Sequence, residues 1–231
     1  MIKGENIMVQ AEVLKRVLRI RCGNSAGTAF TMEINKVQFI VTAKHIFEKV
    51  AYPQSTNIDL LIDGKYRTFT VDIKYPANQY IDIAVMKTKP LTNVTPTYSN
   101  KNSSAGCIFG QDVYFLGFPF NYEKLLSNFP ESNAPAPFIK KACFSGAQGK
   151  YQFFLDGINN PGFSGGPVCF KPQNERLFCI AGVVSGYRYN QVPVYDKKTN
   201  DPLPYYIEEN TGIIIVSDIC SAVDIAENWS N

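Results

Sequence analysis

The sequence predicts an all-β protein, and three features support that fold class. Short runs of β-branched and aromatic residues recur along the chain, turn residues separate them, and no helical period alternates with them. Such a succession is typical of a sandwich or barrel. The length of 231 residues suits one large domain or a single two-barrel unit. The predicted strands are 18–22, 27–34, 37–42, 58–62, 68–74, 81–87, 112–118, 141–146, 152–155, 167–170, 177–185 and 212–216.

Helix is predicted at only two places. A short helical turn follows Lys44, and a longer helix covers 217–229, with Ser217 or Asp218 as its N-cap. The apolar side of this longer helix would consist of Ile219, Val223 and Ile225.

Two stretches interrupt the succession of strands. Residues 119–140 contain four prolines and polar spacers, and we expect them to connect two halves of the fold. Residues 187–211 are rich in tyrosine and proline, which predicts a long hairpin or loop. Such a loop either contributes to specificity or is a solvated excursion, and the sequence favours neither.

Composition excludes several classes of function. The net charge is +3 without a dense basic run, so we expect no nucleic-acid binding. No apolar run is long enough to span a membrane, and residues 1–10 lack the apolar core of a secretory signal. These features predict a cytoplasmic protein that does not bind membranes.

The six cysteines are expected to be free thiols. None forms a CxxC pair, and a single histidine gives little support for a zinc site, so no metal is predicted. Most lie beside apolar residues, where a thiol behaves as a small hydrophobic group. Cys169 and Cys179 could still pair across a hairpin, and the sequence leaves that possibility open.

The strongest local feature is the run 160–168, Asn-Pro-Gly-Phe-Ser-Gly-Gly-Pro-Val. A nucleophilic serine needs its Oγ exposed on a tight turn, with backbone N–H groups converging on the developing oxyanion. Glycine permits the φ values and the close approach that such a turn requires. The run therefore predicts Ser164 as nucleophile and the N–H groups of Gly162 and Ser164 as oxyanion donors. A glycine-rich β-turn without chemistry is the alternative.

His45 is the only histidine in the chain. Within the run 39–47 it ends an apolar, strand-like stretch, and it lies upstream of the serine run. Serine nucleophiles require an imidazole as general base, so His45 is the one candidate for that role. A lone histidine is otherwise more often a structural or surface residue.

Asp82 stands inside the apolar run 80–86. A carboxylate there is costly to bury unless it is paired or hydrogen-bonded. Orientation of His45 would supply such a partner. The alternatives are an aspartate on the solvent face of an edge strand, or one of the competing acids Asp59, Asp63 and Asp72.

Together these blocks resemble the trypsin/chymotrypsin family of serine peptidases, and more closely its bacterial trypsin-like branch. The family order of histidine, aspartate and serine matches His45, Asp82 and Ser164. The matching blocks are Val-Thr-Ala-Lys-His at 41–45, Asp-Ile-Ala-Val at 82–85 and Gly-Phe-Ser-Gly-Gly-Pro at 162–167. Supporting matches lie at 27–30, 116–119 and 181–186, so that the resemblance covers residues 15–225.

The resemblance implies two six-stranded antiparallel β-barrels of the chymotrypsin type, with the active site between them and a short C-terminal helix. Residues 1–118 would form the first barrel, with His45 and Asp82. Residues 119–140 would be the linker, and 141–231 the second barrel with Ser164 and the helix.

The family's pocket for the substrate residue before the scissile bond corresponds here to Ile158, Ser185, Gly186 and Tyr187. Ser185 would also approach Asp82. Because Ile158 takes the place of an acid at the pocket base, the resemblance implies an uncharged, apolar substrate residue.

The sequence departs from the family pattern at two positions. Phe163 stands where secreted, zymogen-activated members carry an acid that pairs with a newly cut N-terminus, so activation by clipping is not expected. Lys44 precedes His45, where a small residue is common. A cation there would lower the pKa of His45, but we expect Lys44 to point to solvent.

The sequence thus predicts a serine endopeptidase that acts on protein or peptide substrates through an acyl-enzyme, without cofactor or metal. One alternative is an effector protease that stays dormant until a regulatory protein partner or ligand orders its loops. Another is a protease-fold binding module without activity, and a viral polyprotein protease would have a similar fold. An α/β-hydrolase is disfavoured, because its nucleophile precedes the acid and the histidine.

Overall fold

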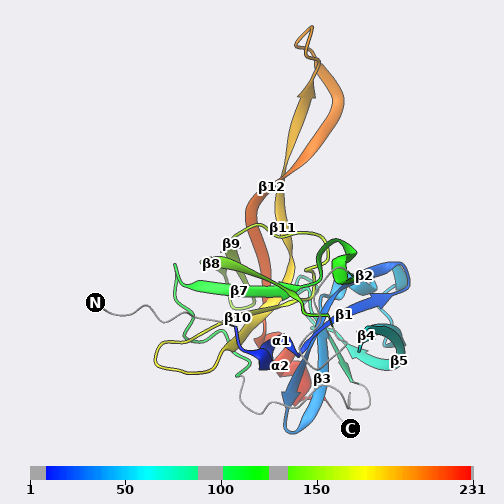
Figure 1. Ribbon diagram of the computed structural model, residues 1–231, viewed down its shortest axis with the longest axis vertical. Helices are drawn as coiled ribbons and strands as arrows, with labels where there is room; N and C mark the ends of the chain where they lie inside the picture. Colours follow the sequence, from blue (N-terminus) through cyan, green and yellow to red (C-terminus); the bar gives the residue numbers. More distant parts are fainter. Residues whose placement is uncertain (1–8, 88–100, 125–134, 230–231) are drawn as a thin grey trace.

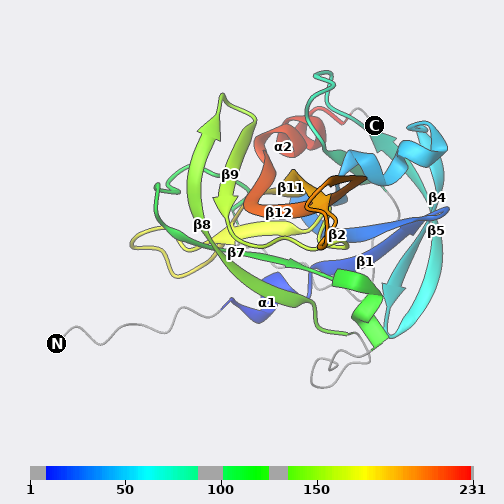
Figure 2. The same cartoon turned by 90° about the horizontal axis from the view of Figure 1, so that it is seen from above.

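The computed structural model describes residues 9–87, 101–124 and 135–229, and its strands pair into two closed six-stranded barrels (Figure 1, Figure 2). In pairing order, the first barrel contains β1 (Val17–Cys22), β2 (Ser25–Ile34), β3 (Val37–Thr42), β6 (Ala84–Lys87), β5 (Lys65–Lys74) and β4 (Ser55–Ile62). The second contains β10 (Pro167–Phe170), β11 (Cys179–Tyr195), β12 (Pro202–Asp218), β9 (Gln152–Asp156), β8 (Phe138–Gln148) and β7 (Asp112–Gly117). The predicted all-β class and the two barrels are confirmed.

Four short helices complete the described chain: α1 (Ala11–Leu14), η1 (Lys44–Val50), η2 (Pro119–Lys124) and α2 (Cys220–Glu227). The predicted C-terminal helix is present but shorter, because β12 continues through Asp218. Ser217 is therefore a strand residue and not a helix cap. The carboxylate of Asp218 accepts the N–H of Cys220 at 2.9 Å and so satisfies one donor of the first turn.

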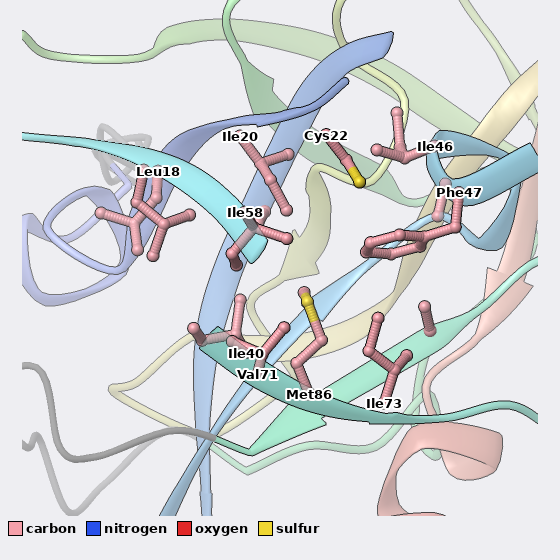
Figure 3. Close-up of a cluster of buried hydrophobic side chains, with 14 of the residues drawn as sticks. Leu18, Ile20, Cys22, Ile40, Ile46, Phe47, Ile58, Val71, Ile73 and Met86 are labelled. Atoms are coloured by element: carbon pink, nitrogen blue, oxygen red, sulfur yellow. The ribbon is translucent and has the colours of Figure 1, made fainter. Parts of the chain in front are cut away.

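The interior of the first barrel positions the turn that carries the histidine. Alternate strand residues point inward, and apolar side chains from β1, β3, β4, β5 and β6 fill the barrel (Figure 3). Ile46 and Phe47, which follow His45 in η1, insert into the same cluster, and the ring of Phe47 points toward Ile73 and Met86. Burying each such side chain contributes about 1.5–3 kcal/mol, so η1 is held firmly at the end of the barrel.

The opposite faces of two of these strands pack against the second barrel. Phe39 and Val41 of β3 and Val85 of β6 join a second cluster, which also contains Val183 of β11 and Ile219 beside α2. β3 and β6 are thus buried on both faces. Their ends, where His45 and Asp82 lie, meet the second barrel.

The change from one barrel to the other precedes residue 112. β7 pairs with β8 and β10, so it belongs to the second barrel although it lies before the predicted boundary at residue 118. The predicted linker, 119–140, contains η2 and the first residues of β8, while its residues 125–134 lie outside the described chain.

A two-stranded ribbon, residues 188–211, projects from the second barrel and is called the arm below (Figure 1). β11 pairs with β10 only as far as Val183, and β12 pairs with β9 only from Ile213 onward. Between these points the two strands pair with each other alone. The sequence prediction of a long hairpin or loop is thus resolved as a hairpin.

All six cysteines are free, including Cys169 and Cys179. Cys169 pairs in register with Ile180, and Cys179 with Phe170, so the two thiols stand on neighbouring rungs and not opposite each other. Among the described residues, no helix is both long and apolar enough to cross a membrane.

Candidate active site

Asp82 holds His45 by two hydrogen bonds. The backbone N–H of His45 donates to Asp82 Oδ1 at 2.9 Å, and His45 Nδ1 lies 2.7 Å from Asp82 Oδ2. Asp82 comes just before β6, and β6 pairs with β3, whose last residue is Thr42. The pairing of these two strands therefore sets the two side chains at one end of the barrel.

The environment of His45 raises its pKa above the ordinary value of 6.5. Burial favours the neutral ring and lowers the pKa, but the hydrogen bond and negative charge of Asp82, with a contribution from Glu48, outweigh it. The imidazole side chain is still 39% exposed, so its free edge faces the solvent-accessible surface.

Two serines connect Asp82 to the second barrel. The N–H of Asp82 donates to Ser217 Oγ at 3.3 Å, and Ser217 Oγ lies 2.9 Å from Ser185 Oγ. The expected approach of Ser185 to Asp82 thus runs through Ser217, a residue that the sequence identified only as a helix cap. Ser217 is 1% exposed, so these bonds are shielded from water.

Ser164 lies on the nucleophile loop, residues 157–166, which joins β9 to β10 and rests on the first barrel. The N–H of Thr28 in β2 donates to the carbonyl of Ser164 at 2.8 Å. A Cβ placed on Gly27 would lie 2.7 Å from that carbonyl and 2.6 Å from Cδ1 of Ile46, the residue after His45. The loop therefore brings the backbone of Ser164 against the same glycine as the turn of His45.

Glycine is required at Gly165 for this close approach. Its φ is +86°, and a Cβ would lie 2.1 Å from the carbonyl of Thr28 and 2.8 Å from the nitrogen of Ala43. Any side chain would push the loop away from the end of β3. The glycines of the serine run thus serve contact between the barrels as well as the turn.

The expected oxyanion donors are free. The carbonyl of Pro161 accepts the N–H of Phe120 at 2.9 Å, and the carbonyl of Phe163 accepts the N–H of Gly166 at 2.8 Å. In a trans peptide, C=O and N–H point in opposite directions, so the N–H groups of Gly162 and Ser164 point away from these contacts. Within the described chain, neither N–H donates a hydrogen bond.

Thr28 fixes the turn that carries these donors. Its hydroxyl donates to the carbonyl of Gly162 at 2.7 Å and accepts the N–H of Phe118 at 3.1 Å. Gly162 has φ +105°, and a Cβ there would lie 2.3 Å from the carbonyl of Phe118. Thr28 is fully buried. Because its hydroxyl binds the oxyanion turn, it is a residue of the site, and the sequence alone did not reveal this role.

Phe163 is fully buried and packs edge-to-face on Phe115 at 5.0 Å between ring centroids. The ammonium of Lys140, in β8, lies 5.8 Å from both ring centroids. It donates to Asn160 Oδ1 at 2.9 Å and to the carbonyl of Ile158. Burial lowers the pKa of Lys140 below its ordinary value.

The structure places two of the predicted pocket residues at the surface. Ile158 is 51% exposed, and Tyr187 lines a hollow of about 440 Å³ at the root of the arm. The other residues that line this hollow are Arg188, Tyr189, Gln191 and Ile215. The side-chain amide of Asn210 in the arm donates to the carbonyl of Asn159 at 2.8 Å, which ties the arm to the nucleophile loop.

The ammonium of Lys44 lies at an exposed position, as expected for a side chain that points to solvent. Its ammonium donates to the carbonyl of Gln79 at 3.1 Å and lies 5.3 Å from the ring of Tyr52. These contacts give its charge local partners. The lowering of the His45 pKa that a neighbouring cation would cause is not found, because that pKa is raised.

The site can be compared with known proteins. Solved structures of similar fold include the Rv3671c protease from M. tuberculosis, with a TM-score of 0.56, 16% identity and coverage of 95% of this chain and 92% of that chain. The HtrA-type protease AlgW has a TM-score of 0.57 and 16% identity, with 94% of this chain but 60% of that chain covered. Human heparin binding protein has a TM-score of 0.57 and 12% identity, with coverage of 96% and 93%.

At these identities the structural likeness shows the fold alone, and that fold occurs both in proteases and in a protein named for binding. No curated protein matches this chain. A family model, the trypsin-like peptidase domain, matches residues 27–178, which is more than half of the chain. The chain therefore belongs to the trypsin-like peptidase family.

Proposed function

We propose that this protein is a serine endopeptidase that hydrolyses peptide bonds through an acyl-enzyme. Ser164 is the nucleophile, His45 the general base, and Asp82 the residue that orients His45. The N–H groups of Gly162 and Ser164 bind the oxyanion, and the reaction proposed here uses no cofactor. The substrate is a protein or peptide.

The observation that carries this proposal is the pair of hydrogen bonds from His45 to Asp82. Because Asp82 accepts from Nδ1–H, the neutral ring keeps its lone pair on Nε2, where a serine proton can be taken. The raised pKa of His45 supports the same role, since a stronger base removes that proton more readily.

The reaction then follows from the groups present. His45 takes the hydroxyl proton as Ser164 Oγ attacks the carbonyl carbon, and the oxyanion of the tetrahedral intermediate binds the two free N–H groups. His45 returns the proton to the leaving amine, which leaves an ester on Ser164. Water, deprotonated by His45, hydrolyses that ester and restores the serine.

We also infer that this site needs no N-terminal cleavage. Phe163 fills the position where the resemblance places an acid, and its ring is buried against Phe115. The hydrogen bond from the N–H of Phe120 to the carbonyl of Pro161 already directs the oxyanion turn.

Ile158, which carries no charge, supports an uncharged substrate residue before the scissile bond.

Cleavage of a peptide library by the wild-type protein, with products identified by mass spectrometry, tests the proposal. Ser164→Ala and His45→Ala should each lower the rate by at least about 10⁴-fold while the thermal unfolding midpoint stays close to that of the wild type. Absence of cleavage by the wild type, alone and with cell lysate added, would contradict it.

A further inference from the structure

Lys140 bonds to the nucleophile loop from a neighbouring strand. It lies in β8 directly opposite Phe115 of β7, and its ammonium reaches toward the nucleophile loop. There it donates to the carbonyl of Ile158 and to the side chain of Asn160. Both acceptors precede the oxyanion donor Gly162 by no more than four residues.

The contacts of Lys140 are of the strong, oriented kind. Hydrogen bonds from a charged donor are roughly twice as strong as neutral ones. The ammonium also lies within about 6 Å of two aromatic ring centroids, the range in which cation–π attraction operates. One of these rings belongs to Phe163, the residue immediately before Ser164. Lys140 thus holds the nucleophile loop on both sides of the oxyanion turn.

Other residues hold the nucleophile loop at different atoms from those that Lys140 binds. Thr28 binds the carbonyl of Gly162, and Phe120 binds that of Pro161. Asn210 binds the carbonyl of Asn159 from the arm. Lys140 adds two hydrogen bonds from its ammonium, to Ile158 and Asn160. Burial lowers its pKa, as expected for a cation moved toward apolar rings.

We propose that Lys140 is the internal cation that keeps the oxyanion turn in its working conformation, so that the enzyme is active without N-terminal cleavage. Lys140 is a positioning residue: it acts through Ile158, Asn160 and Phe163 and does not touch the reacting atoms. The inference rests on the proposed function, because it concerns the rate at which Ser164 reacts.

The test is the rate at which a fluorophosphonate labels Ser164, measured by mass spectrometry for the wild type, Lys140→Met and Lys140→Arg. Lys141→Met is the matched control, because Lys141 is the next residue, is exposed and pairs with Asp112 at the surface. We expect Lys140→Met to slow labelling on the order of 10- to 100-fold, the effect of misplacing groups in a site by about 1 Å. Lys140→Arg should recover part of the rate, and Lys141→Met should label like the wild type.

Two further readouts separate positioning from a loss of stability. Ethylammonium added to Lys140→Ala should restore labelling, since it supplies the missing cation. The wild-type rate should also fall at alkaline pH with a midpoint below 10.5, the ordinary lysine pKa, and Lys140→Met should lack that fall. A purely structural role would lower the unfolding midpoint and leave the pH profile unchanged.

The outcomes distinguish this inference from the proposed function. If the wild type is not labelled, the proposed function fails. If the wild type is labelled, and Lys140→Met reacts at the same rate or ethylammonium restores nothing, Lys140 does not act as proposed.

Discussion

The nucleophile loop and the arm both leave the second barrel, but they are held in opposite ways. The loop is pressed onto the first barrel, where Gly165 leaves no space for a Cβ beside the carbonyl of Thr28. The strands of the arm pair only with each other, and the arm contacts the nucleophile loop through the bond from Asn210 to Asn159. Tyr189, Tyr205 and Tyr206 are 54%, 65% and 66% exposed. The loop's conformation therefore depends on distant residues, whereas that of the arm depends on its own hairpin.

The nucleophile loop is therefore more tightly constrained by the rest of the protein than the arm is. An isolated two-stranded ribbon is marginally stable in water, while a loop bonded to several other elements opens only with the structure around it. We therefore expect small changes in the loop to have large effects on reactivity, and large changes in the arm to have small ones. Three predictions follow the comparison from the largest effect to the smallest.

The largest effect is expected for Gly162→Ala. The new Cβ would lie 2.3 Å from the carbonyl of Phe118, at a φ of +105° that alanine rarely adopts, so the oxyanion turn must move. Labelling of Ser164 should slow by about 10²–10³-fold, the cost of losing one oxyanion donor. Gly146→Ala is the control, because its Cβ would meet only Phe154, at 3.6 Å. Equal rates for both variants would mean that the turn is not constrained.

A smaller effect is expected for Thr28→Val. This change of similar size removes the hydroxyl that binds the carbonyl of Gly162 and the N–H of Phe118. Leaving such buried groups unpaired costs about 1–3 kcal/mol, so labelling should slow about tenfold and the unfolding midpoint should fall. Thr31→Val, at another buried threonine of β2, controls for the substitution itself. An unchanged labelling rate would show that the link between the barrels is not needed.

The smallest effect is expected for removal of the arm. Tyr189 and Asn210 are paired, so residues 190–209 can be replaced by Asn-Gly, the two residues of a tight hairpin turn. Asn210 and its bond to Asn159 stay in place. The free energy of unfolding should change by no more than about 0.5 kcal/mol. The rate at which Ser164 is labelled should change by no more than about threefold. An unfolded or unreactive product would break the comparison, since the arm would then support the site.

A pH profile sharpens the account of the loop's partner, His45. Labelling requires the neutral ring, so the rate should fall as pH decreases through a midpoint above 6.5, and Asp82→Asn should move that midpoint down. The same shift has a consequence for stability. Protonated His45 stabilises the fold fully below pH 6.5, and this contribution is lost as pH rises through the raised pKa. An acid midpoint that Asp82→Asn leaves in place would contradict the assignment.

Much of the framework could be predicted from local sequence. Each predicted strand overlaps an observed one, because the apolar runs are the residues that line the barrels. The extent of β11 and β12 was missed. In the arm no side is buried, so the alternation that identifies a strand is absent, and prolines at 193, 202 and 204 favour a loop.

Some residues of the candidate site could be predicted from local sequence, and others could not. His45, Asp82 and Ser164 stand in local patterns that chemistry explains, so they could be found. Thr28 and Ser217 act through contacts with residues 134 and 135 positions away, and no local pattern marks them. The position of Lys140 opposite Phe115 is likewise set by the pairing of β7 with β8. The change from the first barrel to the second, before β7, coincides with no change in composition.

The most direct test of the central claim is the site at which a fluorophosphonate modifies the intact wild-type protein, read by mass spectrometry beside Ser164→Ala and His45→Ala. We predict a single adduct on Ser164 that both substitutions abolish. No adduct on folded wild-type protein, or an adduct that His45→Ala leaves at the wild-type rate, would show that Ser164 and His45 do not work as nucleophile and base.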